Sequence, residues 1–143
     1  MARVKIQLPA SFQFFTTIPV RVTDINYGGH VGNDAVVSLV HEARMQYLSH
    51  HGLTELQFRG VGLIMADLAV EFKAESFYGD KIRVAVACSD FTRVGFDIIY
   101  ELSKEGTGKK SVVALVKSGM VCYDYGLKKV SSLPPGIKEL LGT

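Results

Sequence analysis

The chain opens with an apolar stretch that favours extended structure. Residues 4–22 are rich in β-branched and aromatic side chains, with Phe12 and Phe14 on one parity, and Thr23-Asp24 closes the run. We predict a strand here. The glycines of Asn26-Tyr27-Gly28-Gly29 then permit backbone conformations that other residues avoid, so the chain should turn sharply.

A long helix is expected after this turn. It should begin near Asn33 or Asp34, whose side chains can accept hydrogen bonds from first-turn amides, and it should end before Gly52. Between these limits, apolar residues recur at the spacing of one buried helical stripe over about five turns. The stripe consists of Val36, Val40, Ala43 and Tyr47.

From Leu63 onward the apolar period changes to two, which indicates strands. Links at residues 78–80, 92–95 and 105–108 are typical of hairpins, so the pattern predicts an antiparallel meander. The four predicted apolar faces are Leu68, Val70 and Phe72; Ile82, Val84, Val86 and Cys88; Phe96, Ile98, Tyr100 and Leu102; and Val112, Ala114, Val116 and Met120.

The C-terminal region should end the sheet and add a short helix. Leu133-Pro134-Pro135 stops the last strand, and Pro135 or Gly136 can open a helix that holds Ile137, Leu140 and Leu141. Strand, long helix and further strands in this order predict an α+β fold, with one helix against one face of an antiparallel sheet. The length fits a single domain over residues 1–143.

Composition and charge narrow the possible functions. Lys and Arg number 16 against 14 Asp and Glu, so the charge of +2 gives no electrostatic case for a nucleic-acid partner. The charge does not exclude a polyanionic small ligand. No apolar stretch approaches a membrane span, and residues 1–5 carry charge without a following apolar region. We therefore expect a cytoplasmic protein without membrane insertion.

The cysteines and histidines do not suggest a metal or redox site. Cys88 and Cys122 lie far apart in apolar segments, so we expect free, buried thiols. His41 and His50 lack the i, i+4 spacing of helical ligand pairs, and no acidic partner motif surrounds these two residues or His51. No metal is predicted.

One segment carries a specific resemblance. Residues 21–33 read RVTDINYGGHVGN, which resembles the signature loop of the 4-hydroxybenzoyl-CoA thioesterase-like superfamily of hot-dog-fold thioesterases. The resemblance extends over nearly the whole chain. Further similar segments are His41-Glu42-Ala43-Arg44, Tyr78-Gly79-Asp80, Val121-Cys122-Tyr123-Asp124 and Leu133-Pro134.

The resemblance carries expectations about fold, assembly and activity. It implies a hot-dog fold, in which a curved antiparallel sheet of about five strands wraps one long central helix. It implies a homodimer or homotetramer with the active site at the subunit interface. It also implies a hydrolase of an acyl-CoA or acyl-carrier thioester that needs no cofactor, because coenzyme A is part of the substrate.

Thioester hydrolysis requires a group that activates water and donors for the carbonyl oxyanion. A glycine-rich turn that leads into a helix presents backbone amides at the positive end of the helix dipole. The amides of Gly29, His30 or Val31 are therefore candidate oxyanion donors, with Gly28 beside them. The alternative is that Gly28 and Gly29 only make the turn.

The general base is the main question that the loop raises. Many relatives read Asp-x-Asp-x-x-Gly, with the second aspartate as the catalytic carboxylate; here Asp24 matches the first and Asn26 stands at the second. An amide cannot be a base, although it can orient water or the thioester carbonyl. His30 is the leading candidate because an imidazole can accept a proton from water at cellular pH.

The plant acyl-ACP thioesterase form of the loop is also similar, with a histidine that matches His30 and a final asparagine that matches Asn33. His30 as a loop histidine held by backbone remains the alternative. Glu42 is a further carboxylate candidate on the helix, and its alternative is a structural pairing with backbone or an Arg. Asp24 is alternatively a clamp on the loop, and Asp34 a helix N-cap.

The resemblance also implies basic side chains for the phosphates of coenzyme A, with ordinary surface charges as the alternative. Candidates are Arg93, Lys109, Lys110 and Lys117. Two rival functions stay open. One is a hot-dog hydratase or dehydratase, and the other is a non-catalytic acyl-CoA-binding protein, which Asn26 favours.

Overall fold

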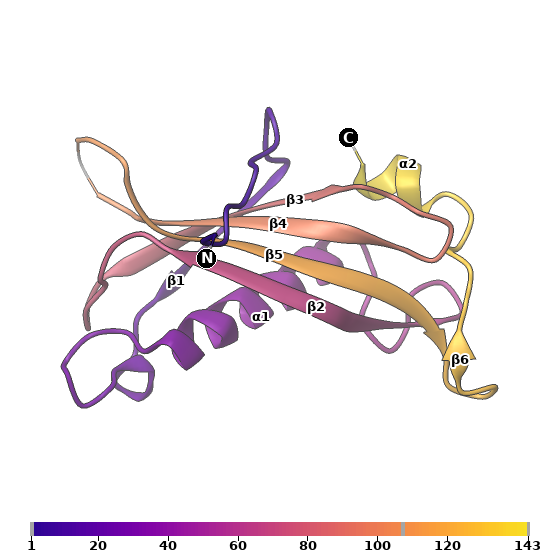
Figure 1. The fold of residues 1–143 in the computed structure, drawn as a ribbon, viewed down its shortest axis with the longest axis horizontal. Coiled ribbons are helices and arrows are strands. Elements are labelled where there is room, and N and C mark those ends of the chain that lie inside the picture. Colours follow the sequence, from indigo (N-terminus) through magenta and orange to yellow (C-terminus); the bar gives the residue numbers. More distant parts are fainter. Residues whose placement is uncertain (1, 107, 143) are drawn as a thin grey trace.

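The computed structural model describes residues 2–106 and 108–142. Within them the chain forms a six-stranded antiparallel sheet, one long helix and short helical segments (Figure 1). In chain order the elements are β1 (Phe14–Pro19), the 3-10 helix η1 (Val22–Asp24), α1 (Asn33–His50), β2 (Gly62–Phe72), β3 (Lys81–Ser89), β4 (Gly95–Lys104), β5 (Ser111–Asp124), β6 (Lys129–Val130) and α2 (Ile137–Leu141).

The strand order is β1-β3-β4-β5-β2, with β6 added to β5. The predicted hairpins between β3, β4 and β5 are confirmed, although Thr107 of the second link lies outside the described residues. The predicted hairpin between β2 and β3 is wrong, because β2 pairs with β5 at one edge while β3 lies beside β1. The turn signal at Gly79 marks a change of direction, and local signals do not specify which strand becomes the neighbour.

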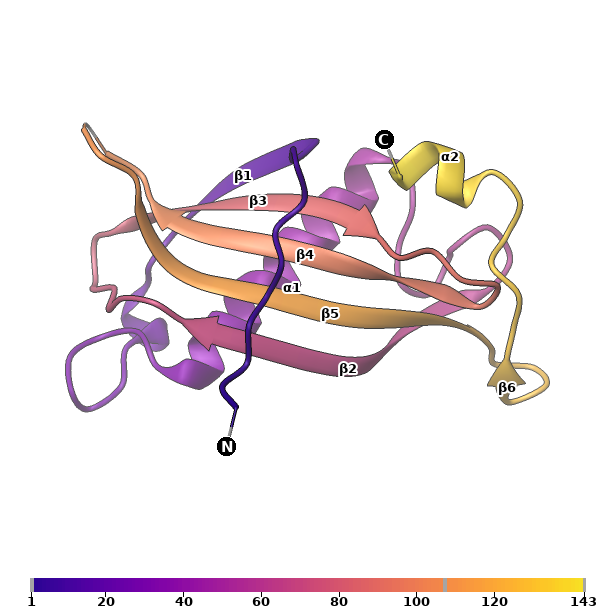
Figure 2. The same cartoon turned by 45° about the horizontal axis from the view of Figure 1, so that its top comes forward.

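The helix α1 lies along one face of the sheet, and the core fills the layer between them (Figures 1 and 2). All four residues of the predicted helical stripe are buried, and so are the predicted faces of β3 and β4 apart from the half-buried Cys88. Both cysteines are free thiols, as expected, with Cys122 fully buried. The α+β class is therefore confirmed.

Two predicted core positions are wrong. The register between β4 and β5 shifts at Leu102/Ser103, so β5 carries one extra residue and Val113 is buried instead of Val112. Such a bulge reverses the alternation of side chains that follow it. Phe72, at the end of β2, is 56% exposed and lines a pocket instead of the core.

The boundaries of α1 agree with the prediction, but its cap does not. Gly32 is the N-cap residue and no side chain caps the helix there. The Asn33 Oδ1 atom accepts a hydrogen bond from the amide of Asp34 at 2.8 Å, and the Asp34 carboxylate turns back toward Gly32. The Asn33 side chain therefore bonds only to the next residue, and no side chain at the N-cap position occupies the first amides of α1.

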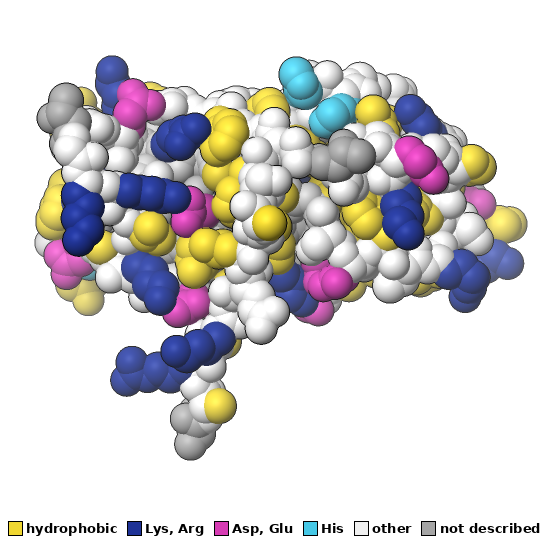
Figure 3. Space-filling view, turned by 90° about the horizontal axis from the view of Figure 1, so that it is seen from above, with side chains coloured by type: hydrophobic (Ala, Val, Ile, Leu, Met, Phe, Trp, Pro, Cys, Tyr) yellow, Lys and Arg dark blue, Asp and Glu magenta, His cyan; other side chains and the backbone are white. Residues whose placement is uncertain are grey.

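The N-terminal strand is shorter than predicted. Only Phe14–Pro19 pairs with β3, while residues 2–13 run across the sheet face that α1 does not cover (Figure 2). Pro9 lacks the amide hydrogen that a paired strand needs. Figure 3 views this outer face, where Lys and Arg are interleaved with Asp and Glu.

The C-terminal helix agrees with the prediction. Gly136 has φ +85° and precedes α2, whose Ile137 and Leu141 are buried against the core. None of the described helices is both long enough and apolar enough to cross a membrane.

Candidate active site

Three short extended segments meet beside the start of α1 and form a small antiparallel ribbon. Ile25 bridges to Val31, and His30 bridges to Phe77. The amide of Asn26 donates to the His30 carbonyl at 2.9 Å, so these two residues stand opposite each other. Because opposite residues of an antiparallel ladder project to the same face, Asn26, His30 and Phe77 share one face.

The sharp turn between the first two segments is confirmed. Gly29 has φ +87°, a conformation that other residues rarely adopt, and its amide donates to the Asn26 carbonyl at 3.0 Å. The Asn26 Oδ1 atom accepts from the Gly28 amide at 2.9 Å. A Cβ at Gly28 would lie 3.2 Å from Asn26 Oδ1 and 3.4 Å from His30 Nε2, so glycine lets both polar groups lie close to this turn.

Asp24 lies under this loop and is only 4% exposed. Its Oδ2 atom accepts from the Arg21 amide at 2.8 Å, and its Oδ1 lies 3.4 Å from Arg21 Nη2. Its carbonyl accepts from the Gly32 amide at 3.2 Å. These contacts fit the clamp that the sequence offered as an alternative, and Asp24 does not line the pocket described next.

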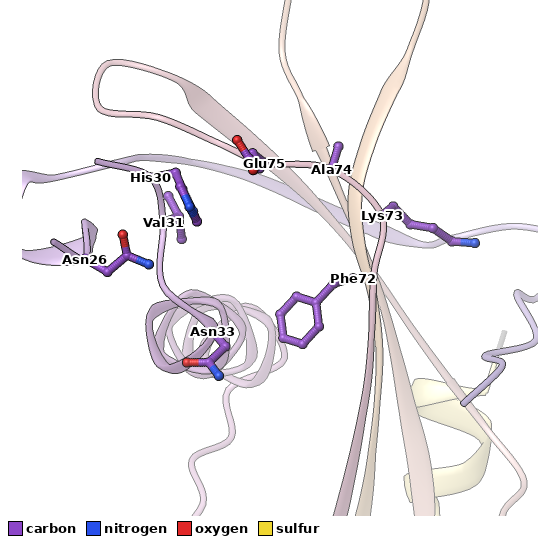
Figure 4. A pocket seen from close by; sticks show the side chains of 8 residues that line it. All are labelled: Asn26, His30, Val31, Asn33, Phe72, Lys73, Ala74 and Glu75. Atoms are coloured by element: carbon purple, nitrogen blue, oxygen red, sulfur yellow. The ribbon is translucent and has the colours of Figure 1, made fainter. Parts of the chain in front are cut away.

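An open pocket of about 580 Å³ lies where the ribbon, the start of α1 and the end of β2 meet (Figure 4). The structure brings together four of the predicted site residues here and adds four that the sequence did not single out. The lining residues are Asn26, His30, Val31 and Asn33, with Phe72, Lys73, Ala74 and Glu75.

The loop amides are largely engaged within the chain. Those of Gly28 and Gly29 donate to Asn26, and that of Val31 donates to the Ser76 carbonyl at 2.8 Å. Among the residues that the structure describes, the amides of His30 and Asn33 have no acceptor. Since Asn33 is the first residue of the 18-residue helix α1, its amide lies at the positive end of the helix dipole.

Besides Asp24, Gly28 and Gly29, which do not line the pocket, two further predicted site residues lie away from it. Glu42 is exposed on α1, where its Oε2 atom accepts from Gln46 Nε2 at 2.7 Å, in a separate groove that Phe14 also lines. Arg93 is exposed in the link after β3, at the opposite end of that strand. Neither residue is among those that line the pocket.

Of the other basic candidates, Lys109 is exposed in the link between β4 and β5, and the remaining two are paired with acidic residues. Lys110 forms an ion pair with Glu101, and Lys117 Nζ lies 2.8 Å from Asp67 Oδ1. His41 lies 3.3 Å from Glu55 on the exposed side of α1. His50 and His51 contact one another and aromatic rings.

Residues 72–75 are the part of the pocket that sequence reasoning missed. Phe72 was assigned to the core because it continues the apolar alternation of β2. Glu75 belongs to the link between β2 and β3, where no periodicity indicates which way a side chain points. What identifies both residues as part of the pocket is the tertiary pairing of the β2–β3 link with the loop of residues 26–31. A single sequence does not display this pairing.

A family model described as the thioesterase-like superfamily matches residues 20–141 of the chain. No protein with curated information matches it. Solved structures do match the chain, and the three described next are at most 22% identical to it, so they show the fold alone.

Three of these structures represent the group. A thioesterase superfamily protein from Jannaschia sp. CCS1 is 17% identical, with 92% of this chain and 82% of that chain covered and a TM-score of 0.81. An Asp-to-Asn mutant of 4-hydroxybenzoyl-CoA thioesterase bound to 4-hydroxybenzoyl-CoA is 18% identical, with 90% of this chain and 97% of that chain covered and a TM-score of 0.80. A 1,4-dihydroxy-2-naphthoyl-CoA thioesterase from Synechocystis is 22% identical, with 85% of this chain and 89% of that chain covered and a TM-score of 0.75.

Proposed function

Because this chain belongs to the thioesterase-like superfamily, we propose that it hydrolyses an acyl-CoA or acyl-carrier thioester to a carboxylic acid and a free thiol. Two of the proteins named above are thioesterases of coenzyme A thioesters, which supports this substrate class. The observation that carries the proposal is the shared face of Asn26 and His30 in a pocket at the start of α1.

His30 acts as the general base in this proposal. Its imidazole takes a proton from water while the water oxygen bonds to the thioester carbonyl carbon. The amide of Asn33 and the positive end of α1 stabilise the resulting oxyanion. When the carbon–sulfur bond breaks, its electron pair stays on sulfur, and the imidazolium returns the proton to the thiolate.

Asn26 orients the reactants in this scheme. Its Oδ1 atom is occupied by the Gly28 amide, so its Nδ2 group remains to donate to the attacking water or to the carbonyl oxygen. Phe72 presents an exposed ring on the other side of the pocket, where it can pack against an apolar acyl group (Figure 4).

A homodimer or homotetramer is part of the proposal. The 11-residue strand β2 ends the sheet, so its outer edge pairs with no described strand, and residues 72–75 of the pocket continue directly from it. An open edge of this length is a template for pairing with a second copy. Light scattering after gel filtration tests this point: a monomer at micromolar concentration contradicts it.

Thiol release from a panel of short, medium, long and aromatic acyl-CoAs tests the activity. We expect turnover of at least one member, and an acyl-carrier substrate run in parallel identifies the preferred thiol. A second function is favoured by one observation, the amide of Asn26 where a carboxylate is usual. If calorimetry detects acyl-CoA binding while no thiol is released from any substrate, the chain is a binding protein and hydrolysis is wrong.

A further inference from the structure

Glu75 belongs to the same small ribbon as Asn26 and His30. His30 stands opposite Phe77, and the Val31 amide donates to the Ser76 carbonyl, so the two segments run antiparallel through this point. Side chains two residues apart on an extended segment project to the same face, which places Glu75 with Phe77 on the face of His30.

The ladder also fixes how close the two side chains can come. Diagonal neighbours of an antiparallel pair have Cα atoms about 7–8 Å apart, within reach of long side chains. His30 and Glu75 are such neighbours, and both line the pocket. Figure 4 shows them on one side of the pocket, with Phe72 and Asn33 on the other.

The charges around His30 leave Glu75 available to it. Two lysines lie near, but Lys73 Nζ is 2.7 Å from Glu71 Oε2, and Lys104 Nζ is 3.5 Å from Asp80 Oδ2. Among the described residues Glu75 makes no ion pair or side-chain hydrogen bond of its own.

The neighbouring aspartates are directed elsewhere. Asp24 is buried and bound to Arg21, and Asp34 turns toward Gly32 without lining the pocket. The loop therefore brings an amide into the pocket at Asn26, and the carboxylate that lines the pocket comes from the β2–β3 link.

We propose that Glu75 is the positioning residue for His30: its carboxylate accepts a hydrogen bond from the imidazole and orients it as the base. This proposal rests on the proposed function. When His30 takes the proton from water, the Glu75 carboxylate stabilises the imidazolium, and Glu75 itself stays ionised. The proton then passes from His30 to the leaving sulfur, so no further reactant is needed.

The first test compares Glu75→Gln with Glu139→Gln, which changes another exposed carboxylate, on α2 and outside the pocket. Glutamine keeps the size of the side chain and removes its charge. We expect kcat to fall about tenfold or more in Glu75→Gln, with KM nearly unchanged, because the orientation of the base affects the chemical step. Glu139→Gln should behave as wild type.

A conservative variant separates positioning from a structural role. Glu75→Asp should recover part of the kcat that Glu75→Gln loses, because it restores a carboxylate that can accept the hydrogen bond of the imidazole. If Glu75→Gln keeps the wild-type kcat, the proposal is wrong.

A double-mutant cycle tests whether Glu75 acts through His30. In a His30→Ala background, Glu75→Gln should cause no further loss of kcat, since there is no imidazole left to orient. A further tenfold loss in that background would mean that Glu75 acts on the reactants directly, which overturns the positioning role.

An activity-independent measurement distinguishes failure of this proposal from failure of the proposed function. The NMR signals of the His30 imidazole nitrogens report hydrogen bonding to this ring and require no substrate. These signals should change in Glu75→Gln and stay in place in Glu139→Gln. If no thioester is cleaved but the signals change, the pair stands and hydrolysis fails; unchanged signals overturn the pair whatever the activity.

Discussion

Two polar clusters of this molecule contrast in how their groups are satisfied. In the layer between α1 and the sheet, Arg44 donates to Glu55 at 3.1 Å and to the Tyr100 hydroxyl at 3.3 Å, and Tyr100 lies 2.8 Å from Ser118 Oγ. Every buried side-chain polar atom of the described residues has a partner. This cluster is closed to ligands because its members satisfy one another.

The pocket cluster, which consists of Asn26, His30 and Glu75, differs because most of its polar groups have no hydrogen-bond partner within the described chain. His30 and Glu75 make no side-chain hydrogen bond within the described chain, and Asn26 uses only its Oδ1 atom. Burying such groups would cost free energy, but here they face an open pocket where water satisfies them. The contrast teaches that a polar side chain of this fold stabilises the core when its hydrogen-bond partners lie within the chain. A polar side chain whose partner is water is available to a substrate.

The largest expected effect concerns the open cluster. His30→Ala should lower kcat/KM about a hundredfold or more, because the general base is removed. The melting temperature should stay close to that of the wild type, since His30 belongs to no buried network. Thiol release and thermal unfolding measure the two quantities, and a His30→Ala variant with wild-type turnover would contradict the assignment.

The matching change in the closed cluster is Tyr100→Phe. It removes the hydroxyl between Arg44 and Ser118, and should lower the free energy of unfolding by about 1–3 kcal/mol because buried partners lose a hydrogen bond. Urea denaturation measures this loss. Activity per folded molecule should be preserved, and a large fall in kcat at unchanged stability would contradict the separation of the two clusters.

A smaller effect is expected at the turn. Gly28→Ala adds a methyl group that would meet Asn26 Oδ1 at 3.2 Å, so Asn26 must shift by a few tenths of an ångström, and it would touch His30 Nε2 at 3.4 Å. We expect kcat to fall roughly three- to tenfold, because small displacements of catalytic groups slow reactions. Gly126→Ala, in the distant β5–β6 turn, serves as the control and should keep wild-type kcat.

The smallest effect is expected in the closed region, at Cys88. Its Sγ atom lies 3.2 Å from the Tyr47 hydroxyl, and burial raises the pKa of the Cys88 thiol to about 12. The folded protein should therefore react very slowly with iodoacetamide at pH 8, because the thiolate is the reactive form. Mass spectrometry after labelling measures this, and rapid modification of native Cys88 would contradict it.

The sign of the pH dependence follows from the same raised pKa. The thiol of the unfolded chain ionises near its ordinary pKa of 9.0, while burial holds the pKa of the folded thiol at about 12. Its contribution to stability is therefore present below pH 9 and is lost as the pH rises toward 12. Urea midpoints at pH 8 and pH 10.5 should show this decline, and it should be weaker in Cys88→Ala.

Much of the fold was predictable because the residues within each helix or strand carry the pattern that identifies it. The stripe of α1 and the alternation of β3 and β4 each follow from side-chain period, which is set by burial on one face. The errors fall where a distant contact decides. The bulge at Val113 and the placement of β2 beside β5 depend on register and crossover, and neither changes the local period.

The candidate site was predictable in part for the same reason. The loop residues Asn26, His30, Val31 and Asn33 lie within eight positions of one another, so their proximity follows from the chain itself. Glu42 shares a helix with Asn33 but lies about two and a half turns further along it, on a surface outside the pocket. Helical spacing alone could not show which candidates share a pocket.

The sequence by itself determined the main elements and their order, the buried stripe of α1, the turn at Gly29 and the presence of an imidazole and an amide in one loop. Period and backbone preference act over a few residues, so they are readable from the chain. Only the tertiary structure paired the loop with Ser76 and Phe77, which brought His30, Glu75 and Phe72 to one pocket. Such pairing depends on how the sheet as a whole covers α1, and no local pattern encodes it.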